Sequence, residues 1–109
     1  MFAHLHKVPT GSPKIISAEA IDPTTVHLSW NPPKSYDRNG IIVYYIINIT
    51  SFNLPTTESF SQHCTTLSCN ISNLHPYYTY QFTVLAVTIG PGPYSEAYTF
   101  TTLEAGKCV

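Results

Sequence analysis

Apolar and polar residues alternate in several short runs along the chain, and three of these runs are clear. Because successive side chains of a strand face opposite sides of a sheet, each run predicts a strand with one buried and one solvated face. The predicted inward sets are Val26, Leu28 and Trp30, then Tyr45, Ile47 and Ile49, then Tyr80, Phe82, Val84 and Ala86.

Weaker runs predict further strands. Ile16, Ala18 and Ile21 indicate a weaker first strand, Cys69 and Ile71 share a face before Leu74, and Tyr98 and Phe100 belong to the last strand. Turn residues separate the runs, and Asn39-Gly40 is typical of a tight turn with positive φ angles. No window has helical periodicity, so we predict about seven strands and no helix. Such strands form a two-sheet sandwich or a closed barrel.

The composition fits one weakly charged domain. The 109 residues are 43 % hydrophobic and 10 % charged, with a net charge of −1. This charge is too small to attract a polyanion, so we expect no nucleic-acid partner. Residues 41–47 form the longest apolar run and are too few to span a bilayer, so we expect no direct membrane insertion. We assign residues 1–12 to a disordered linker, 13–103 to the domain and 104–109 to a disordered tail.

Several residues resemble the pattern of a known family. Trp30 precedes Pro32-Pro33, Leu74-His75-Pro76 leads into Tyr80, and Ala86 precedes a glycine-rich turn. Residues 13–103 resemble a fibronectin type III domain in the order and spacing of these features. The resemblance implies an all-β, seven-stranded, immunoglobulin-like β-sandwich rather than a barrel. It also implies that Trp30 fills the core centre and that the Tyr80 hydroxyl bonds to a backbone acceptor. The expected structural core includes Trp30, Leu74, Tyr80, Phe82 and Val84.

Two sequons indicate glycosylation. Asn48-Ile49-Thr50 and Asn70-Ile71-Ser72 both fit the acceptor pattern. With Ile47, Ile49 and Ile71 facing inward, both asparagines face solvent, so we expect N-glycans at Asn48 and Asn70. Chance occurrence is the alternative, because the chain is rich in Asn, Ser and Thr.

The three cysteines leave at least one unpaired. Cys64 and Cys69 could close a small loop between two strands, or they could be two half-buried apolar residues, and Cys108 has no evident partner. Zinc binding by His63, Cys64, Cys69 and His75 is disfavoured, because their spacing matches neither a zinc finger nor a zinc ribbon. We therefore expect no metal site.

The sequence contains no arrangement that indicates catalysis. The six acidic residues are scattered and no nucleophile motif occurs, so we expect no enzyme activity and no cofactor in this chain. The resemblance implies an extracellular protein-interaction and spacer module, monomeric in isolation, in a tandem array of a cell-surface receptor or adhesion protein. Its partners would be other proteins or neighbouring domains. Receptor-type tyrosine phosphatases carry similar arrays, and a matrix or intracellular scaffold protein is the alternative. Contact area would come from five tyrosines expected off the core: Tyr36, Tyr44, Tyr77, Tyr78 and Tyr94.

Overall fold

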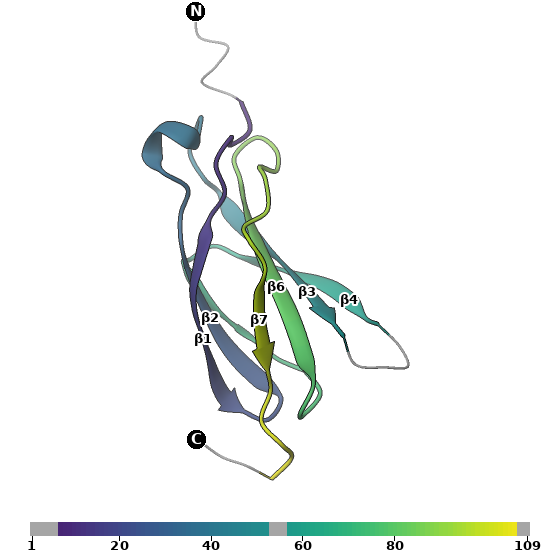
Figure 1. Ribbon diagram of the computed structural model, residues 1–109. Helices are drawn as coiled ribbons and strands as arrows, with labels where there is room; N and C mark the ends of the chain where they lie inside the picture. The colour runs from purple at the N-terminus through teal and green to yellow at the C-terminus, as the bar shows by residue number, and fades with distance from the viewer. Residues whose placement is uncertain (1–6, 53–56, 107–109) are drawn as a thin grey trace, which may run out of the picture.

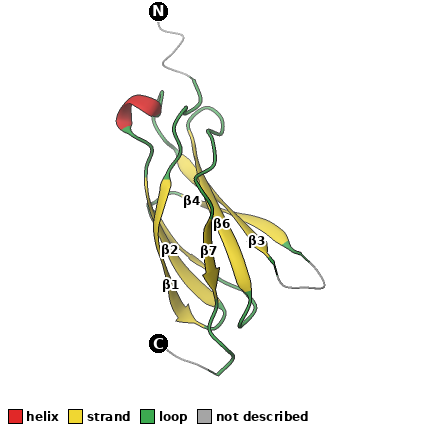
Figure 2. Ribbon diagram, viewed as in Figure 1, coloured by secondary structure: helices red, strands yellow, loops and turns green. Residues whose placement is uncertain are grey.

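The computed structural model describes residues 7–52 and 57–106. Figures 1 and 2 show that this part of the chain contains strands joined by loops, with one turn of 3-10 helix. The strands are β1 (Lys14–Asp22), β2 (Thr25–Asn31), β3 (Tyr44–Ser51), β4 (Ser59–Cys64), β5 (Ser68–Ile71), β6 (Thr79–Val87) and β7 (Tyr98–Thr101), and the helical turn is η2 (Ser35–Asp37). The prediction of seven strands is confirmed, while η2 is too short to produce a helical pattern in the sequence.

The seven strands form two antiparallel sheets. The three-stranded sheet has the order β1-β2-β5, and the four-stranded sheet has the order β4-β3-β6-β7. The inward rows of both sheets meet in one hydrophobic core, so the chain is a β-sandwich, as expected. Among the described residues, no helix has the length and apolar character needed to cross a membrane.

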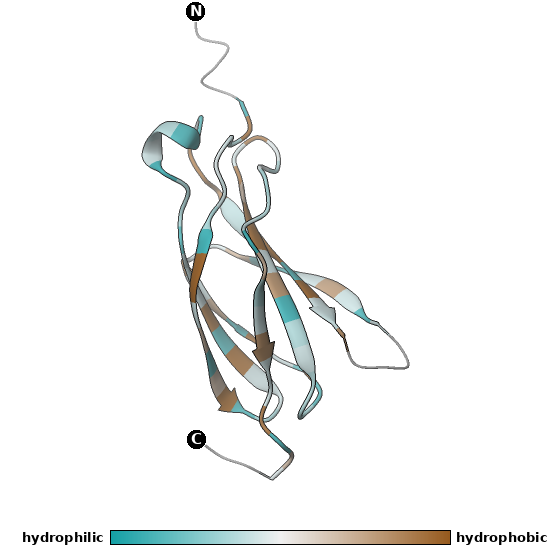
Figure 3. Ribbon diagram, in the orientation of Figure 1, coloured by the Kyte–Doolittle hydropathy of each residue, from teal (hydrophilic) through white to brown (hydrophobic). Residues whose placement is uncertain are grey.

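The core contains the rows that alternation predicts for β2, β3 and β6. Figure 3 shows apolar residues alternating with polar ones along β2. Trp30 is 1 % exposed, and its ring meets the Tyr45 ring edge-on, with 5.6 Å between centroids. Leu74, Tyr80, Phe82 and Val84 are buried in the same cluster. Trp30 therefore lies where inward side chains of both sheets converge.

The prediction of a first strand is confirmed, and β1 is irregular at two positions. Ile16 and Ile21 are about half exposed, whereas Ile15 is buried opposite Trp30. The register of β1 on β2 shifts between Ile15 and Ser17 and again between Ala20 and Asp22, so each of the two exposed isoleucines is the extra residue of a bulge. Each bulge interrupts the simple alternation on which the prediction depended.

The turn before β6 is held by the Tyr80 hydroxyl. The His75 amide donates a hydrogen bond to Tyr80 Oη over 2.7 Å. We expected a backbone acceptor, so the direction of this bond is opposite to the prediction. Burial raises the pKa of Tyr80, and the bond from His75 partly opposes that rise. The same turn is tied to the chain after β7, because Thr102 Oγ1 donates to the His75 carbonyl over 2.7 Å.

Residues 7–12 pack against the sandwich instead of forming part of a disordered linker. The Thr10 amide donates to the Asp37 carbonyl over 2.8 Å, and Thr88 Oγ1 donates to the Lys7 carbonyl over 2.9 Å. A Cβ atom on Gly92 would lie 2.7 Å from Pro9, so the close approach of these segments requires a glycine there. Residues 1–6 lie outside the described part, and residues 104–106 of the expected tail are exposed.

The loop between β2 and β3 contacts this N-terminal segment. Asn39 Nδ2 donates to the Val8 carbonyl over 3.2 Å. Asn39 and Gly40 have φ angles of 56° and 150°, in agreement with the predicted turn. This loop and the loop after β6 lie at the end of the sandwich where the described chain begins, and the last described residues lie at the opposite end (Figure 1).

Candidate functional site

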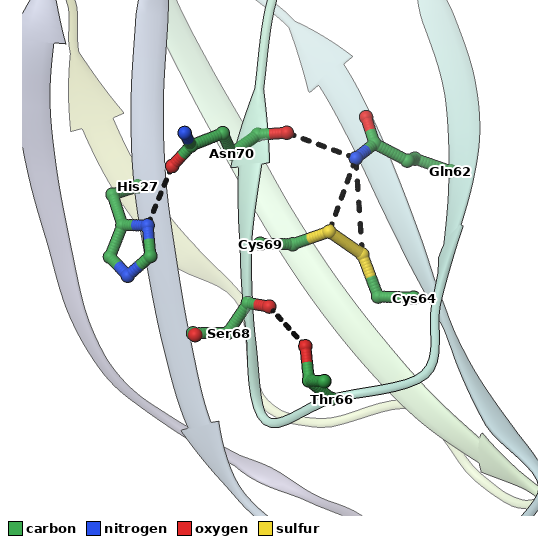
Figure 4. Close-up of a disulfide and its surroundings, with 7 residues drawn as sticks. All are labelled: His27, Gln62, Cys64, Thr66, Ser68, Cys69 and Asn70. Carbon is green, nitrogen blue, oxygen red and sulfur yellow. Dashed lines mark hydrogen bonds between the residues drawn. A yellow bond between two sulfur atoms is a disulfide. The ribbon is translucent and has the colours of Figure 1, made fainter.

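A disulfide joins the edges of the two sheets. Cys64 ends β4, an edge strand of the four-stranded sheet, and Cys69 lies in β5, an edge strand of the three-stranded sheet. Figure 4 shows the bond beside the short turn that connects the strands. The two Cα atoms are 6.5 Å apart, within the usual range for a bridge. The sandwich therefore has a covalent link across one open side.

Gln62 covers this disulfide. Its Nε2 atom lies 3.3 Å from Cys69 Sγ and 3.9 Å from Cys64 Sγ, and it donates a hydrogen bond to the Asn70 carbonyl over 3.0 Å (Figure 4). A side chain of one sheet thus satisfies a carbonyl of the other. Gln62 was not among the predicted site residues, although its position two residues before Cys64 places it on the same face of β4.

The two sequon asparagines lie on different sheets. Asn70 is exposed in β5, and its Oδ1 atom lies 2.6 Å from Nδ1 of His27, its cross-strand neighbour (Figure 4). Asn48 is partly exposed in β3, opposite Ser61 of β4 and Thr83 of β6. N-glycans are attached through the amide nitrogen, and the His27 contact engages the amide oxygen of Asn70. Glycosylation at both residues remains a prediction that this geometry permits.

The residues considered as zinc ligands do not converge. Cys64 and Cys69 are bonded to each other, and the His63 ring stacks on Tyr44 with 4.8 Å between centroids. His75 Nε2 instead lies 3.6 Å from Glu58 Oε1. Within residues 7–52 and 57–106, no group of three or more His, Cys, Asp or Glu side chains is arranged to hold a metal ion. Cys108 lies outside these residues.

The tyrosines expected off the core differ in exposure. Tyr36, Tyr77 and Tyr94 are exposed, whereas Tyr44 is half-buried beside His63. The expectation was wrong for Tyr78, which packs against the core. Its ring lies between those of His75 and Tyr80, and its position two residues before Tyr80 places it on the same face of the chain.

A groove of about 440 Å³ separates the β2–β3 loop from the β4–β5 turn. Its lining residues are Pro32, Arg38, Gly40, Ile41, Ile42, Tyr45, Thr65, Thr66 and Leu67. Burial raises the pKa of Tyr45, and the nearby positive charge of Arg38 opposes that rise. Sequence patterns do not reveal this groove, because its walls come from two segments, residues 32–45 and 65–67, that are distant in the chain.

Curated proteins similar to this chain are much longer. Receptor-type tyrosine-protein phosphatase F of Danio rerio is 30 % identical over 98 residues, which are 89 % of this chain and 5 % of that protein. Protein sidekick-1 of Gallus gallus is 37 % identical over 89 residues, which are 78 % of this chain and 4 % of that protein. Cell adhesion molecule Dscam1 of Drosophila melanogaster is 28 % identical over 97 residues, which are 83 % of this chain and 5 % of that protein. The chain thus spans only a small part of each relative.

Solved structures and a family model agree with the fold. The crystal structure of the FN5 domain of Drosophila Lar has a TM-score of 0.68 and 29 % identity, covering 90 % of this chain and 100 % of that one. The solution structure of the third fibronectin III domain of human KIAA0343 protein has a TM-score of 0.82 and 20 % identity. The match covers 94 % of this chain and 89 % of that one. Residues 11–101 match the model of the fibronectin type III domain. The chain belongs to the fibronectin type III family.

Proposed function

We propose that this chain is an extracellular protein-interaction and spacer module in a tandem array of a cell-surface receptor or adhesion protein. Its relatives include proteins named as a receptor-type tyrosine phosphatase and as a cell adhesion molecule. The chain itself performs no catalysis, and any enzyme activity of the parent belongs to another domain. Its partners are other proteins or neighbouring domains, and the isolated domain is a monomer.

The observation that carries the extracellular assignment is the disulfide between Cys64 and Cys69. Disulfides form and persist in oxidising compartments and are rare in the cytosol. The two sequons add support, because each lies at an outward position of a strand. An intracellular scaffold would give neither the bridge nor the sequons a role.

The spacer role follows from the positions of the chain ends. The first and last described residues lie at opposite ends of the sandwich (Figure 1). Domains attached before and after this one would therefore be held apart by its length. The disulfide and the tied turns limit deformation of the sheets, so surfaces on successive domains would keep a fixed spacing.

Secretion from mammalian cells tests the compartment. The chain is expressed behind a secretion signal, and the intact mass is measured before and after treatment with peptide:N-glycosidase. We expect a mass above the 12.1 kDa polypeptide, with one glycan lost in Asn48→Gln and one in Asn70→Gln. Peptide mapping without reduction is expected to show the Cys64–Cys69 bridge. A secreted polypeptide with neither glycan nor bridge would contradict the extracellular assignment.

The recognition role requires a binding experiment. The secreted domain is displayed as a multimer and screened against an array of cell-surface ectodomains. Saturable binding to one or a few of them is the expected result. A domain that binds no ectodomain, alone or within its parent chain, would contradict the recognition role. A membrane-spanning segment in the parent would distinguish a receptor from a matrix protein.

A further inference from the structure

The groove between the β2–β3 loop and the β4–β5 turn has two fixed walls. On one side, the Asp37 carbonyl accepts a bond from the Thr10 amide, and Arg38 Nε donates to the Pro33 carbonyl over 2.9 Å. On the other side, the disulfide closes residues 65–68, and the Trp30 amide donates to the Leu67 carbonyl over 3.0 Å. The groove is thus held open by contacts that need no ligand, which lowers the entropy cost of binding.

Two residues on this groove have donor atoms without a protein acceptor in the described structure. Tyr45 is 5 % exposed, yet its hydroxyl makes no hydrogen bond with any described residue. The ion pair between His75 and Glu58 is the only one in this part of the chain, so Arg38 has no carboxylate within 4.0 Å. The hydrogen bond from Arg38 Nε to the Pro33 carbonyl orients the guanidinium. The two terminal nitrogens of Arg38 have no acceptor among the described residues. The Tyr45 hydroxyl and the terminal nitrogens of Arg38 are therefore available to donate to a ligand in the same groove.

The remaining lining residues are uncharged. Arg38 is the one charged residue on the groove, and the neighbouring Asp37 side chain lies against Gly11 instead. Ile41 is 85 % exposed, and Leu67 is also exposed, so apolar side chains stand at the rim. Thr65 and Thr66 also line the groove, and the Thr66 hydroxyl donates to the Ser68 carbonyl over 2.8 Å. The site therefore combines one positive charge with donors and an apolar border.

We propose that this groove binds an aspartate or glutamate side chain of a partner protein, with Arg38 as the anchor and the Tyr45 hydroxyl as a second donor. A guanidinium presents paired N–H groups that match a carboxylate. The apolar rim fits hydrophobic residues on either side of the acidic one. The groove has a single cation and the whole chain has a net charge of −1. This charge distribution disfavours binding of a polyanion such as a sulfated glycan. This inference rests on the proposed role as a protein-interaction module.

Titration of the ¹⁵N-labelled chain with a peptide probe, followed by amide NMR, tests the inference. The probe is the blocked tripeptide acetyl-Leu-Glu-Leu-amide, and its matched control has Gln in place of Glu. We expect saturable shifts at the amides of Gly40, Thr65 and Thr66, and about tenfold weaker binding of the Gln peptide. Equal responses to both peptides, or shifts only outside the groove, would overturn the proposal.

Variants assign the effect to named atoms. Arg38→Gln is expected to weaken binding of the Glu peptide about tenfold, and Tyr45→Phe, which keeps the ring, to weaken it several-fold. The control Lys34→Gln removes an exposed charge that does not line the groove and should leave binding unchanged. The amide spectrum of each variant reports whether it is folded. Unchanged binding in a folded Arg38→Gln variant would refute the proposal.

This outcome is separable from that of the proposed function. A secreted, glycosylated domain that binds an ectodomain but whose groove ignores the Glu peptide would refute only the carboxylate site. A groove that binds the peptide in a chain that carries neither bridge nor glycan after secretion would support the site and contradict the extracellular assignment.

Discussion

Tyr80→Phe is the sharpest test of how the turn before β6 is held. The substitution removes one oxygen atom and leaves the buried aromatic ring in place. Tyr80 is 2 % exposed, and its hydroxyl accepts the His75 amide over 2.7 Å. The variant therefore deletes a hydrogen bond without emptying the core.

The expected cost follows from what happens to the His75 amide. If its N–H loses this acceptor without gaining water, the penalty is that of an unpaired polar group, about 1–3 kcal/mol. For a domain of this size, each kcal/mol lowers the melting midpoint by roughly 4–8 °C. The neighbouring Thr102 bond to the His75 carbonyl remains, so the turn should loosen locally without unfolding.

Thermal and urea unfolding of matched variants measure this cost. Tyr94→Phe is the control, because it removes the same atom from a side chain that is 51 % exposed. Its stability should stay within about 0.5 kcal/mol of the wild type. If Tyr80→Phe melts at the same temperature as Tyr94→Phe, the hydroxyl does not stabilise the turn and the reasoning is wrong.

Three further predictions concern stability. Trp30→Ala should lower the unfolding free energy by about 3–5 kcal/mol in urea titrations, and Trp30→Phe by less, because the buried indole N–H has no hydrogen-bond partner among the described residues. Replacing Cys64 and Cys69 together by Ala should cost about 2 kcal/mol, measured against the oxidised wild type. Stability should be retained below the ordinary tyrosine pKa of 10.0 and fall as the pH rises through the higher folded-state pKa values of Tyr45 and Tyr80. In urea titrations at increasing alkaline pH, Tyr45→Phe should lose less of its unfolding free energy than the wild type does.

Alternation along the chain predicted the interior strands better than the edge strand β1. In β2, β3 and β6 the residues assigned inward are buried, because a strand without bulges keeps a strict period of two. In β1 the exposed residues Ile16 and Ile21 mark register shifts that apolar character alone does not reveal. Sequence patterns show which residues are apolar, but the pairing partner decides where a bulge falls.

The candidate site was only partly predictable for a related reason. The short gap between Cys64 and Cys69 made a bridge one of two interpretations of the sequence, because local spacing is visible there directly. The contact of Gln62 with Asn70, by contrast, depends on β4 approaching β5 across the gap between sheets. The groove beside Arg38 similarly depends on two loops that meet only in the folded chain. Local chemistry was therefore visible in the sequence, and contacts between sheets were not.

The disulfide connects stability to recognition in this domain. Its loop is short, so its loss should remove only about 2 kcal/mol of the 5–15 kcal/mol typical of a folded domain. The same bond closes the turn that forms one wall of the proposed carboxylate groove. Because the hydrogen bond from the Trp30 amide to the Leu67 carbonyl remains after reduction, the wall would lose one of its two attachments while the core stayed packed. The bridge therefore matters more for the geometry of this surface than for the folding of the sandwich.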